Sequence, residues 1–453
     1  MANPVLVIAA VSFAIWLYLL LARGNFWNLQ QYDDDDASLP APSSWPVVAA
    51  VIPARNEAVT IAQTIASLTQ QNYPGKFSIV VVDDHSEDAT AKIAQESAQK
   101  NRVKSNAARD VTILSAPPLQ SGWTGKLSAL NAGIEFALDP LPESSGQPGP
   151  QGSPPPAQNA PSTQNLSFRA ERGICFSSAS SRTSTHEPPA YLWFTDADVV
   201  HAPDTLRRLV SRAEQHNLDL TSLMVLLRAQ TLPERFLIPP FLFFFLMLYP
   251  PAKIASSKSR VAGAAGGCIL LRRDALDRIG GLAAIRSEVI DDCALARAVK
   301  NSATDKIPAS TNTSAAKAPA PKIWMGLTRK SRSLRAYTTF AEIRDMIART
   351  AFTQLRYSTL LLVGTLFGLA ITYLAPIALL FAHDIFTRVI ALATWLLMSL
   401  LFLPSVRFYR ISTHWAASLP AAALFYAAAT TLSAIRYWTN RGAQWKGRSQ
   451  APR

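Results

Sequence analysis

The chain has 453 residues, of which 49% are hydrophobic and 17% charged, and its formal net charge is +13. This length allows a soluble domain with its own core together with further segments. The three cysteines are an odd number without a C-x-x-C pair, which argues against a disulfide framework and indicates a reducing compartment. The basic residues cluster beside uncharged apolar runs, and no nucleic-acid-binding motif is present. Anionic membrane lipids, and not nucleic acid, are therefore the predicted partner of this charge.

The first segment is an uncharged apolar run from Pro4 to Ala22. It is about as long as a membrane-spanning helix, which needs ~20 residues. A cleaved signal peptide is the alternative, but no basic region precedes the run and no clear small-residue cleavage site precedes Arg23. Residues 1–24 are therefore predicted to be a transmembrane anchor, and Arg23 after the span places the following domain in the cytoplasm.

Residues 45–300 alternate between strand-like and helix-like segments. Apolar runs of strand character are separated by stretches with apolar residues at helical spacing, and these runs lie at 47–52, 79–82, 111–114 and 192–195. Such a pattern predicts an α/β fold whose mostly parallel sheet is covered by helices on both faces. In sheets of this kind, ligands bind beyond the carboxyl ends of the strands.

Carboxylates follow two of the predicted strands. Asp83 and Asp84 end the second strand, and Asp196 and Asp198 follow the strand at 192–195. On an extended segment, the i, i+2 spacing of Asp196 and Asp198 points both side chains the same way. Hard oxygen ligands in this position suit Mg²⁺ or Mn²⁺, with the phosphates of a substrate completing the shell. The alternative for Asp83 and Asp84 is that they only cap the helix that follows.

Two segments interrupt this pattern. Residues 139–190 are rich in Pro, Ser, Gly and Gln, and residues 301–321 are rich in Ala, Thr, Ser and Pro. Neither can bury enough apolar surface to order itself, so both are predicted to be flexible insertions. A functional lid is the alternative for the first of them.

Apolar runs return toward the C-terminus. After an amphipathic or interfacial region at 322–357, a transmembrane bundle is predicted over 358–436, with candidate spans at 360–381, 389–406 and 415–435. If all of them cross the membrane, the basic tail at 437–453 lies outside, against the positive-inside tendency, so one helix is expected to be interfacial or re-entrant. A further run, Phe236 to Pro251, is predicted to be a membrane-surface segment, with a core helix as the alternative.

Five motifs in order resemble the family 2 glycosyltransferases, which have the nucleotide-sugar-binding fold called GT-A. The resemblance covers roughly residues 47–300. The motifs are Val51-Ile52-Pro53-Ala54-Arg55-Asn56-Glu57, Val81-Val82-Asp83-Asp84-His85-Ser86, Gly125-Lys126-Leu127-Ser128-Ala129-Leu130-Asn131, Thr195-Asp196-Ala197-Asp198 and Ile290-Asp291-Asp292. The flanking apolar segments and the stretch 352–357 look most like the hopene-associated glycosyltransferases of bacteria.

This resemblance implies a role for each motif. On the donor side, residues of the first two motifs would line the nucleotide pocket, and a lysine and an asparagine would lie by the diphosphate; these residues are Pro53, Ala54, Glu57, Asp83, Asp84, Lys126 and Asn131. Asp198 would bind the metal, with Asp196 beside it or facing the donor sugar. Asp292 would be the general base, and the residues on the acceptor side would be Asp291, Gly266, Gly267 and Arg356.

The chemistry of sugar transfer accounts for these residue types. Displacing a nucleoside diphosphate builds negative charge on the leaving phosphate, which a cation on Asp198 and the nearby Lys126 would stabilise. A carboxylate that takes the proton of the acceptor hydroxyl contributes roughly 10²- to 10⁴-fold, and one base opposite the leaving group implies inversion. The alternatives are that Lys126 is a solvated lysine, that Asp291 and Asp292 only favour a helix N-terminus, and that the glycines form a plain turn.

One departure from the family concerns processivity. Processive members carry Q-x-x-R-W after the base, whereas this chain has Thr353 and Tyr357 around a retained Arg356. The expected function is therefore a single transfer, from a nucleotide sugar such as a UDP-sugar to a membrane lipid such as a hopanoid. A polyprenyl-phosphate acceptor and an inactive membrane scaffold are the alternatives. The predicted location is the bacterial inner membrane, with several spans and the catalytic domain facing the cytoplasm.

Overall fold

The computed structural model describes residues 3–29, 32–33, 39–104, 110–139, 187–302, 322–439, 444–445 and 448–449. Within them, the largest sheet has eight strands in the order β3-β2-β1-β4-β7-β6-β8-β5. Parallel pairing joins β1 to β2 and β4, β2 to β3, and β6 to β8, while the remaining neighbours are antiparallel. The strands are β1 (Val48–Ala54), β2 (Phe77–Asp83), β3 (Asp110–Ser115), β4 (Tyr191–Phe194), β5 (Val199–His201), β6 (Leu220–Leu226), β7 (Ile269–Arg272) and β8 (Ile323–Ser333).

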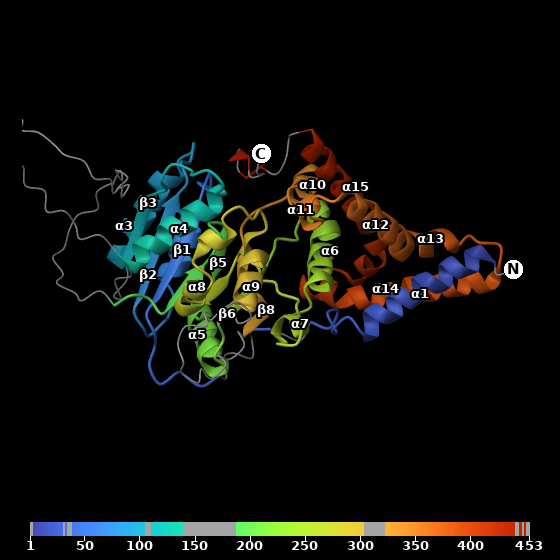
Figure 1. Ribbon diagram of the computed structural model, residues 1–453, viewed down its shortest axis with the longest axis horizontal. Coiled ribbons are helices and arrows are strands. Elements are labelled where there is room, and N and C mark those ends of the chain that lie inside the picture. Colours follow the sequence, from blue (N-terminus) through green and yellow to red (C-terminus); the bar gives the residue numbers. More distant parts are fainter. Residues whose placement is uncertain are drawn as a thin grey trace, which may run out of the picture.

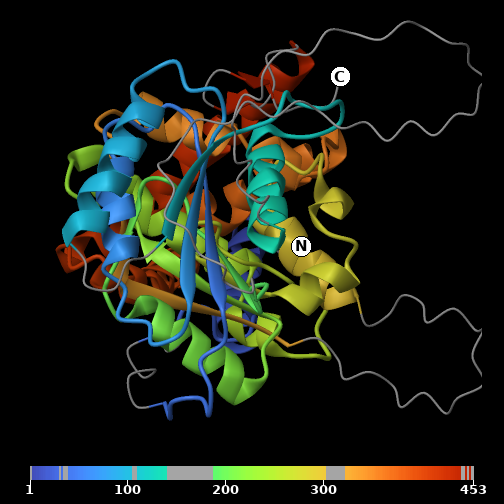
Figure 2. The ribbon, with the colours of Figure 1, turned by 90° about the vertical axis from the view of Figure 1, so that its left-hand side faces the viewer.

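Helices cover both faces of this sheet, as the alternation of apolar segments predicts. One face carries α2 (Ile61–Thr69), α3 (Thr90–Lys104) and α5 (Thr205–His216), and the other carries α4 (Gly125–Leu138), α8 (Arg273–Arg278), η2 (Leu282–Ile285) and α9 (Asp291–Asn301). Figure 2 shows α2 and α3 in blue on one side of the strands and α4 in teal on the other. Successive residues of β1 serve opposite faces, since Ala50 packs with α2 and Val51 with α4.

The close approach of α4 to the sheet depends on Gly133. A Cβ atom at this position would lie 2.4 Å from Cγ1 of Val51 and 2.9 Å from Cγ2 of Val82. No larger residue fits there without moving the helix, so Gly133 lets α4 pack tightly above β1 and β2. This packing positions the N-terminus of α4, where Lys126 lies.

The sheet extends beyond the domain boundary predicted at residue 300. The segment 323–333, expected within an amphipathic or interfacial region, instead forms β8, which pairs with β6 and β5. The insertion at 301–321 separates β8 from the rest of the domain in sequence, which hid the continuity of the pattern. A smaller difference is that β1 continues through Pro53; β4 ends opposite Val51, so Pro53 lies beyond the part of β1 that has strands on both sides.

Among the described residues, five helical segments are long and apolar enough to cross a membrane: Pro4–Leu21, Leu232–Ala255, Thr359–Leu379, Ile385–Phe408 and Thr413–Trp438. They comprise α1 (Pro4–Leu21), α6 (Leu232–Leu248), α7 (Pro251–Ala255), α12 (Thr359–Leu369), η3 (Ala370–Leu374), α13 (Ala375–Leu379), α14 (Ile385–Phe408), η4 (Thr413–Ser418) and α15 (Leu419–Trp438). Figure 1 shows α1, α12–α13 and α14 extending away from the sheet along the long axis, with the N-terminus at the far end.

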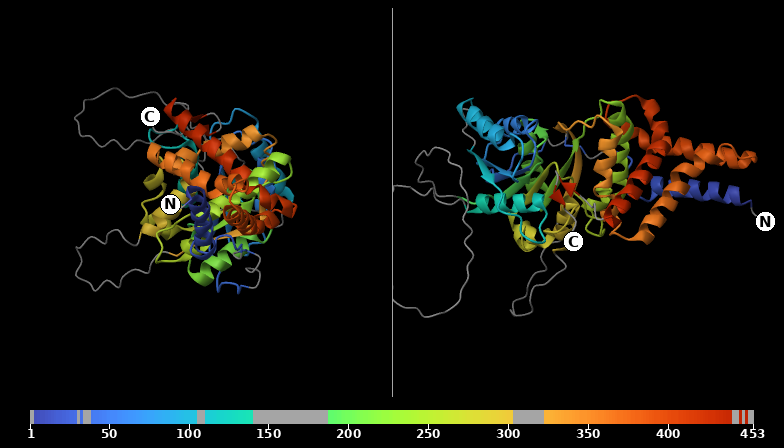
Figure 3. Two further views of the ribbon diagram at one scale, coloured as in Figure 1. Left: turned by 90° about the vertical axis from the view of Figure 1, so that its right-hand side faces the viewer. Right: turned by 90° about the horizontal axis from the view of Figure 1, so that it is seen from above.

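The segment α6 differs from these three in direction and in burial. It crosses the direction of α1 and α14 next to the sheet domain (Figures 1 and 3). Its segment is 61% buried, compared with 22% for Pro4–Leu21. The run predicted from Phe236 thus begins earlier, at Leu232, and continues into α7, so it reaches the length of a membrane span.

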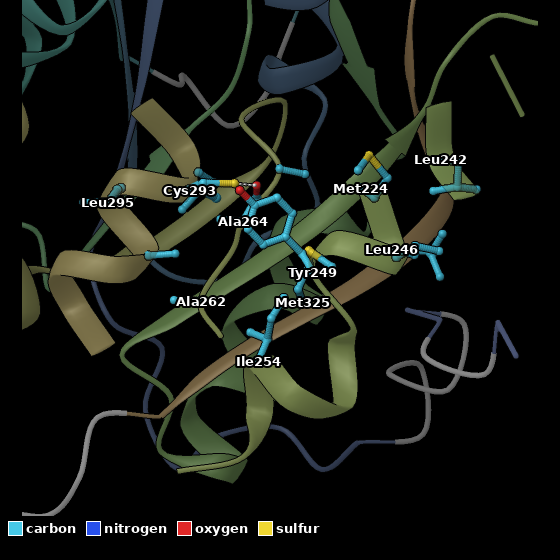
Figure 4. Close-up of a cluster of buried hydrophobic side chains, with 14 of the residues drawn as sticks. Met224, Leu242, Leu246, Tyr249, Ile254, Ala262, Ala264, Cys293, Leu295 and Met325 are labelled. Carbon is cyan, nitrogen blue, oxygen red and sulfur yellow. Dashed lines mark hydrogen bonds between the residues drawn. The ribbon is translucent and has the colours of Figure 1, made fainter. Parts of the chain in front are cut away.

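One apolar core joins the sheet domain to the apolar helices. Met224 of β6 and Met325 of β8 pack in the same cluster as Leu242 and Leu246 of α6. Figure 4 shows this cluster, in which Tyr249 at the end of α6 points toward Cys293 of α9. Continuous burial of this kind makes the helices and the sheet one packed unit.

The helix α15 does not run the full length of α14. The indole nitrogen of Trp395, near the middle of α14, donates to the carbonyl of Ala417 just before α15 begins. At its other end, α15 packs on α10 (Phe340–Ala348) and α11 (Ala351–Gln354), where Arg436 pairs with Asp345 at 2.7 Å. The helix therefore starts beside the middle of α14 and ends next to α10.

Most of the predicted insertion at 139–190 and of that at 301–321 lies outside the described residues, as does most of the tail at 437–453. The two cysteines among the described residues, Cys268 and Cys293, are buried and free. A short second sheet pairs β9 (Gln444–Trp445) with β10 (Arg448–Ser449).

Candidate active site

Three parallel strands end side by side at one edge of the sheet. Ala54 at the end of β1 pairs with Asp83 at the end of β2, and Phe194 at the end of β4 lies opposite Val51. Asp196 follows β4 by two residues, so the carboxylates that come after separate strands meet at the same edge. This is the edge at which α/β sheets bind their ligands.

A pocket at this edge brings together six of the predicted site residues. They come from β1, the N-terminus of α4, the turn after β4, the loop before β7 and the N-terminus of α9, and they are Pro53, Lys126, Asp196, Gly266, Asp291 and Asp292. The rest of the lining is mostly apolar, with Leu127, Leu130, Phe194, Ile269, Leu282, Ile285 and Leu295 around these polar groups. A few polar side chains in an otherwise apolar pocket are typical of a small-molecule site.

Lys126 lies between the carboxylates of this pocket. Its ammonium nitrogen is 3.1 Å from an oxygen of Asp196 and 3.1 Å from an oxygen of Asp291, and the lysine side chain is 19% exposed. Burial disfavours the charged form of Lys126, but the surrounding carboxylates outweigh burial and raise its pKa above the ordinary value. The lysine is therefore a fixed positive charge, and the alternative of a solvated surface lysine is wrong.

Asp292 is held at the first turn of α9. One of its carboxylate oxygens accepts from the amide of Gly266 at 2.9 Å, and the other accepts from the amide of Cys293 at 2.7 Å. A Cβ atom on Gly266 would lie 3.3 Å from that first oxygen, so the glycine permits the backbone to come this close. Burial, followed by repulsion from Asp291, raises the pKa of Asp292 to about 6. A carboxylate with such a pKa is poised to accept a proton near neutral pH.

Asp198 belongs to a second charged cluster. Its carboxylate accepts a hydrogen bond from the hydroxyl of Ser333 at 3.0 Å and lies 3.6 Å from Nε of Arg335. The same guanidinium donates to Glu57 at 2.9 Å, which ties the turn after β1 to the turn after β4. Burial, followed by repulsion from Asp196, raises the pKa of Asp198 to about 6.

A buried polar network holds the turn that carries Asp196 and Asp198. The hydroxyl of Thr195 donates to the carbonyl of Gly267 and lies 2.8 Å from Nε2 of His201. The other ring nitrogen of His201 lies 2.8 Å from the hydroxyl of Ser331 on β8. Burial lowers the pKa of His201 to about 3, so the ring is neutral at physiological pH and acts as a structural support.

The remaining predicted residues do not line the pocket. Asp83 accepts hydrogen bonds from the hydroxyl and the amide of Ser86, so it holds its own turn. This turn lies four residues before α3 begins at Thr90, so these bonds are not the helix cap of the alternative interpretation. Asp84 is buried beside it, and its amide donates to the carbonyl of Ala54. The amide side chain of Asn131 donates to Glu135, one turn along α4.

Two predicted residues on the acceptor side, Gly267 and Arg356, do not line the pocket. A Cβ atom on Gly267 would meet Val225 of β6 at 3.0 Å, so this glycine serves close packing in the sheet. Arg356 occupies a left-handed turn (φ 51°) between α11 and α12, and Tyr357 after it has φ 56°. Consecutive non-glycine residues in this conformation are unusual.

The sequence analysis missed the basic residues of the second cluster. Ser333 and Arg335 follow residues 329–332, one of the basic runs that were expected to contact anionic lipids. Arg349, at the end of α10, also lies close enough to Asp196 to stabilise its negative charge. Burial raises the pKa of Asp196, but Lys126, Arg349 and Arg335 together hold it below its ordinary value. The first six residues of β8 are all buried, but the basic residues that follow them gave no local signal that this segment reaches the site.

Asp196 and Asp198 are the residues that could hold a divalent cation. Their mutual repulsion and the burial of Asp198 disfavour a second negative charge, and a cation would relieve both effects. Within the described ranges, no group of three His, Cys, Asp or Glu side chains is placed to hold a metal ion alone. Phosphate and water oxygens would have to complete the shell, as is common for Mg²⁺.

A solved structure shares this architecture. The mannosyltransferase PcManGT from Pyrobaculum calidifontis, in complex with GDP-Man and Mn²⁺, matches with a TM-score of 0.51 over 96% of this chain and 99% of its own. Its sequence is 16% identical, so the likeness shows the GT-A fold alone.

Curated relatives match over shorter stretches. The probable glycosyltransferase YdaM of Bacillus subtilis is 33% identical over 130 residues, or 26% of this chain and 28% of that protein. The glycosyltransferase AglE of Haloferax volcanii is 35% identical over 94 residues, or 20% of this chain and 27% of that protein. The matched stretches thus span just over a quarter of the length of these relatives.

Two family models cover most of the chain. The model for glycosyl transferase family 2 matches residues 49–140, which contain the first three motifs. The model for glycosyl transferase family 21 matches residues 186–450, more than half of the chain, including the turn with Asp196 and the start of α9. The chain therefore belongs to glycosyl transferase family 21.

Proposed function

We propose that the protein is a membrane-bound, inverting glycosyltransferase that moves one sugar from a nucleotide-diphosphate sugar to a membrane lipid. The observation that carries this proposal is the position of Lys126, whose ammonium group bridges Asp196 of the donor-side turn and Asp291 beside the candidate base. Donor and acceptor groups thereby share one pocket, as a direct displacement requires.

On the donor side, this chain supplies carboxylates and positive charge. Asp198, with Asp196, would hold the divalent cation, Mg²⁺ or Mn²⁺, and that cation would neutralise the charge that develops on the leaving diphosphate. Lys126 adds a fixed positive charge in the same pocket, where the apolar lining strengthens its electrostatic effect. The Mn²⁺ and GDP-Man in the PcManGT structure support both the cation and the class of donor.

On the acceptor side, Asp292 would accept the proton of the attacking hydroxyl. The amide of Gly266 orients the carboxylate, and burial keeps its pKa close to the pH at which a base is effective. With Asp292 as the one base on the acceptor hydroxyl, the reaction would be a single displacement with inversion at the sugar carbon. The departures at Thr353 and Tyr357 favour one transfer over polymerisation.

The apolar helices support a lipid acceptor. We propose that α1, α12–α13 and α14 cross the bacterial inner membrane, that α6 lies at its surface, and that α15 is re-entrant. Both the sheet domain and the end of α15 then face the cytoplasm, which agrees with the positive-inside tendency. The resemblance to the hopene-associated enzymes favours a hopanoid as the acceptor.

Cysteine labelling tests this arrangement. In a variant without native cysteines, we expect Thr439→Cys to react with an impermeant maleimide only from the cytoplasmic side and Asp384→Cys only from the opposite side. Labelling of both positions from the same side would contradict three spans between Asn3 and Tyr409.

The function itself is tested by a donor screen. Purified full-length protein is supplied with UDP-, GDP- and dTDP-sugars, Mn²⁺ or Mg²⁺ and membrane lipids, and the lipid extract is analysed by mass spectrometry. We expect a single added sugar on one class of lipid. If no donor gives metal-dependent hydrolysis or lipid labelling, the inactive-scaffold alternative is favoured. A glycosylated polyprenyl phosphate as the labelled product would favour the alternative in which polyprenyl phosphate is the acceptor.

A further inference from the structure

The guanidinium of Arg335 occupies a position between two parts of the donor site. It donates to Glu57 at 2.9 Å and lies 3.6 Å from the carboxylate of Asp198. The side chains of Glu57 and Asp198 are each 14% exposed, whereas that of Arg335 is 30% exposed. The arginine therefore covers two buried carboxylates from the open side and remains accessible to a ligand.

The backbone around Arg335 is attached to the turn that contains Asp198. The amide of Leu334 donates to the carbonyl of Asp198 at 2.7 Å. The hydroxyl of Ser333 accepts from the amide of Arg335 at 3.2 Å and donates to the carboxylate of Asp198 at 3.0 Å. These bonds place the base of the arginine side chain next to Asp198 whatever the guanidinium does.

We propose that Arg335 balances the negative charge of Asp198 in the donor-free protein and gives up that contact when a divalent cation and the donor bind, turning its guanidinium to the donor's diphosphate. The inference rests on the proposed function, since it assigns a residue to the diphosphate of that donor. A cation bound to Asp198 would lie next to the guanidinium, which is 3.6 Å from the same carboxylate. The two positive charges would repel each other, so the guanidinium is expected to leave. The planar fork of an arginine then matches the oxygens of a diphosphate, which it can bind through two hydrogen bonds.

This role differs from that of a structural brace in the sign of its effect on cation binding. If Arg335 competes with the cation for Asp198, its loss strengthens cation binding in the absence of nucleotide. If the same residue binds diphosphate, its loss weakens nucleotide binding once the cation is saturating. A brace that only kept Glu57 and Asp198 in place would weaken both.

The experiment measures the two effects separately on the full chain in nanodiscs. Free Mn²⁺ is titrated without nucleotide and followed by electron paramagnetic resonance, and UDP, GDP and dTDP are then titrated at saturating Mn²⁺. For Arg335→Gln, we expect Mn²⁺ to bind about tenfold more tightly and the preferred nucleotide about tenfold more weakly, since each change removes one charge interaction worth about a factor of ten.

Two further variants serve as controls. Arg332→Gln removes the same charge from an exposed position on β8, three residues earlier, and both affinities should stay within about twofold of wild type. Arg335→Lys keeps the charge but not the fork, so Mn²⁺ affinity should stay near wild type while nucleotide binding weakens. Melting temperatures confirm that each variant is folded, and Arg335→Lys carries the test if Arg335→Gln is not.

The outcomes separate this inference from the function on which it rests. If the wild type binds a nucleotide but Arg335→Gln binds Mn²⁺ no more tightly, or the nucleotide no more weakly, the role of Arg335 is overturned and the proposed function stands. If the wild type binds none of the three nucleotides in Mn²⁺, the proposed function is overturned and the role of Arg335 with it.

Discussion

The two charged clusters of the candidate site, one around Lys126 and one around Arg335, differ in how their positive member is held. Lys126 is 19% exposed, begins a long helix and touches carboxylates from two other elements, whereas Arg335 is 30% exposed and follows the last strand of the sheet. The first cluster is therefore a fixed part of the pocket, and the second is open to exchange with a ligand. Five variants, from the largest expected effect to the smallest, test this difference and the roles assigned to the other residues of the site.

Asp292→Asn should have the largest effect on activity. Without a carboxylate to accept the hydroxyl proton, we expect transfer to a lipid hydroxyl to fall by roughly 10²- to 10⁴-fold. The measurement is the rate at which label passes from the donor to the lipid extract. A phosphate acceptor is already anionic and needs no base, so a mild effect would favour the polyprenyl-phosphate alternative.

Lys126→Met should destabilise the protein more than Arg335→Gln does. Removing the ammonium leaves partly buried carboxylates without their counter-charge, and we expect a loss of about 3 kcal/mol in the free energy of unfolding. The side chain of Arg335 is more exposed, so Arg335→Gln should lower the free energy of unfolding by no more than about 1 kcal/mol. Thermal or denaturant unfolding of both variants in the same detergent makes the comparison. Equal losses would contradict the distinction between a fixed Lys126 and an exchangeable Arg335.

The pH dependence of transfer should report on Asp292. Its raised pKa of about 6 means that the carboxylate form is lost as the pH falls through 6, so activity should be present above that pH and lost below it. Asp291→Asn removes the negative charge that repels the carboxylate form of Asp292. This removal stabilises that form and should move the acidic limb about half a unit to one unit lower in pH. A limb that stays in place or moves upward would exclude Asp292 as the titrating group.

Asn131→Ala should have the smallest effect. The side chain bonds to Glu135 on the outer part of α4 and does not line the pocket, so we expect activity within about twofold of wild type and a stability change of about 0.5 kcal/mol. A tenfold rise in the KM for the donor would instead support the donor-side role that the resemblance implies for Asn131.

The sequence was sufficient for the carboxylates and for most of the sheet. The role of Asp292 was implied only by the resemblance, since two carboxylates at a helix start also occur without any function. Asp196 could be found because it follows a strong local signal, a buried strand. Arg335 could not, because nothing in a basic run reveals that the chain forms β8 after an insertion of some twenty residues. Contacts between elements distant in sequence depend on the register of the sheet, which local patterns do not encode.

The apolar helices show the same limit. Hydropathy identified α1, α12–α13, α14 and α15, but length and composition do not distinguish a span from a re-entrant helix. The conflict between a basic tail and the positive-inside tendency was the one signal that some helix does not cross. The contact of Trp395 with Ala417, which places the start of α15 beside the middle of α14, is the reason that α15 is proposed to be that helix.

The central claim is that Asp196 and Asp198, in the turn after β4, hold the cation of a metal-dependent donor site. The most direct test is the release of nucleoside diphosphate from the preferred donor as a function of Mn²⁺, for the wild type and for Asp198→Asn. We predict that chelation abolishes release, that Mn²⁺ restores it, and that Asp198→Asn lowers the rate by about 10²-fold even at high Mn²⁺. Equal rates with and without chelator, or an Asp198→Asn variant as active as wild type, would contradict the claim.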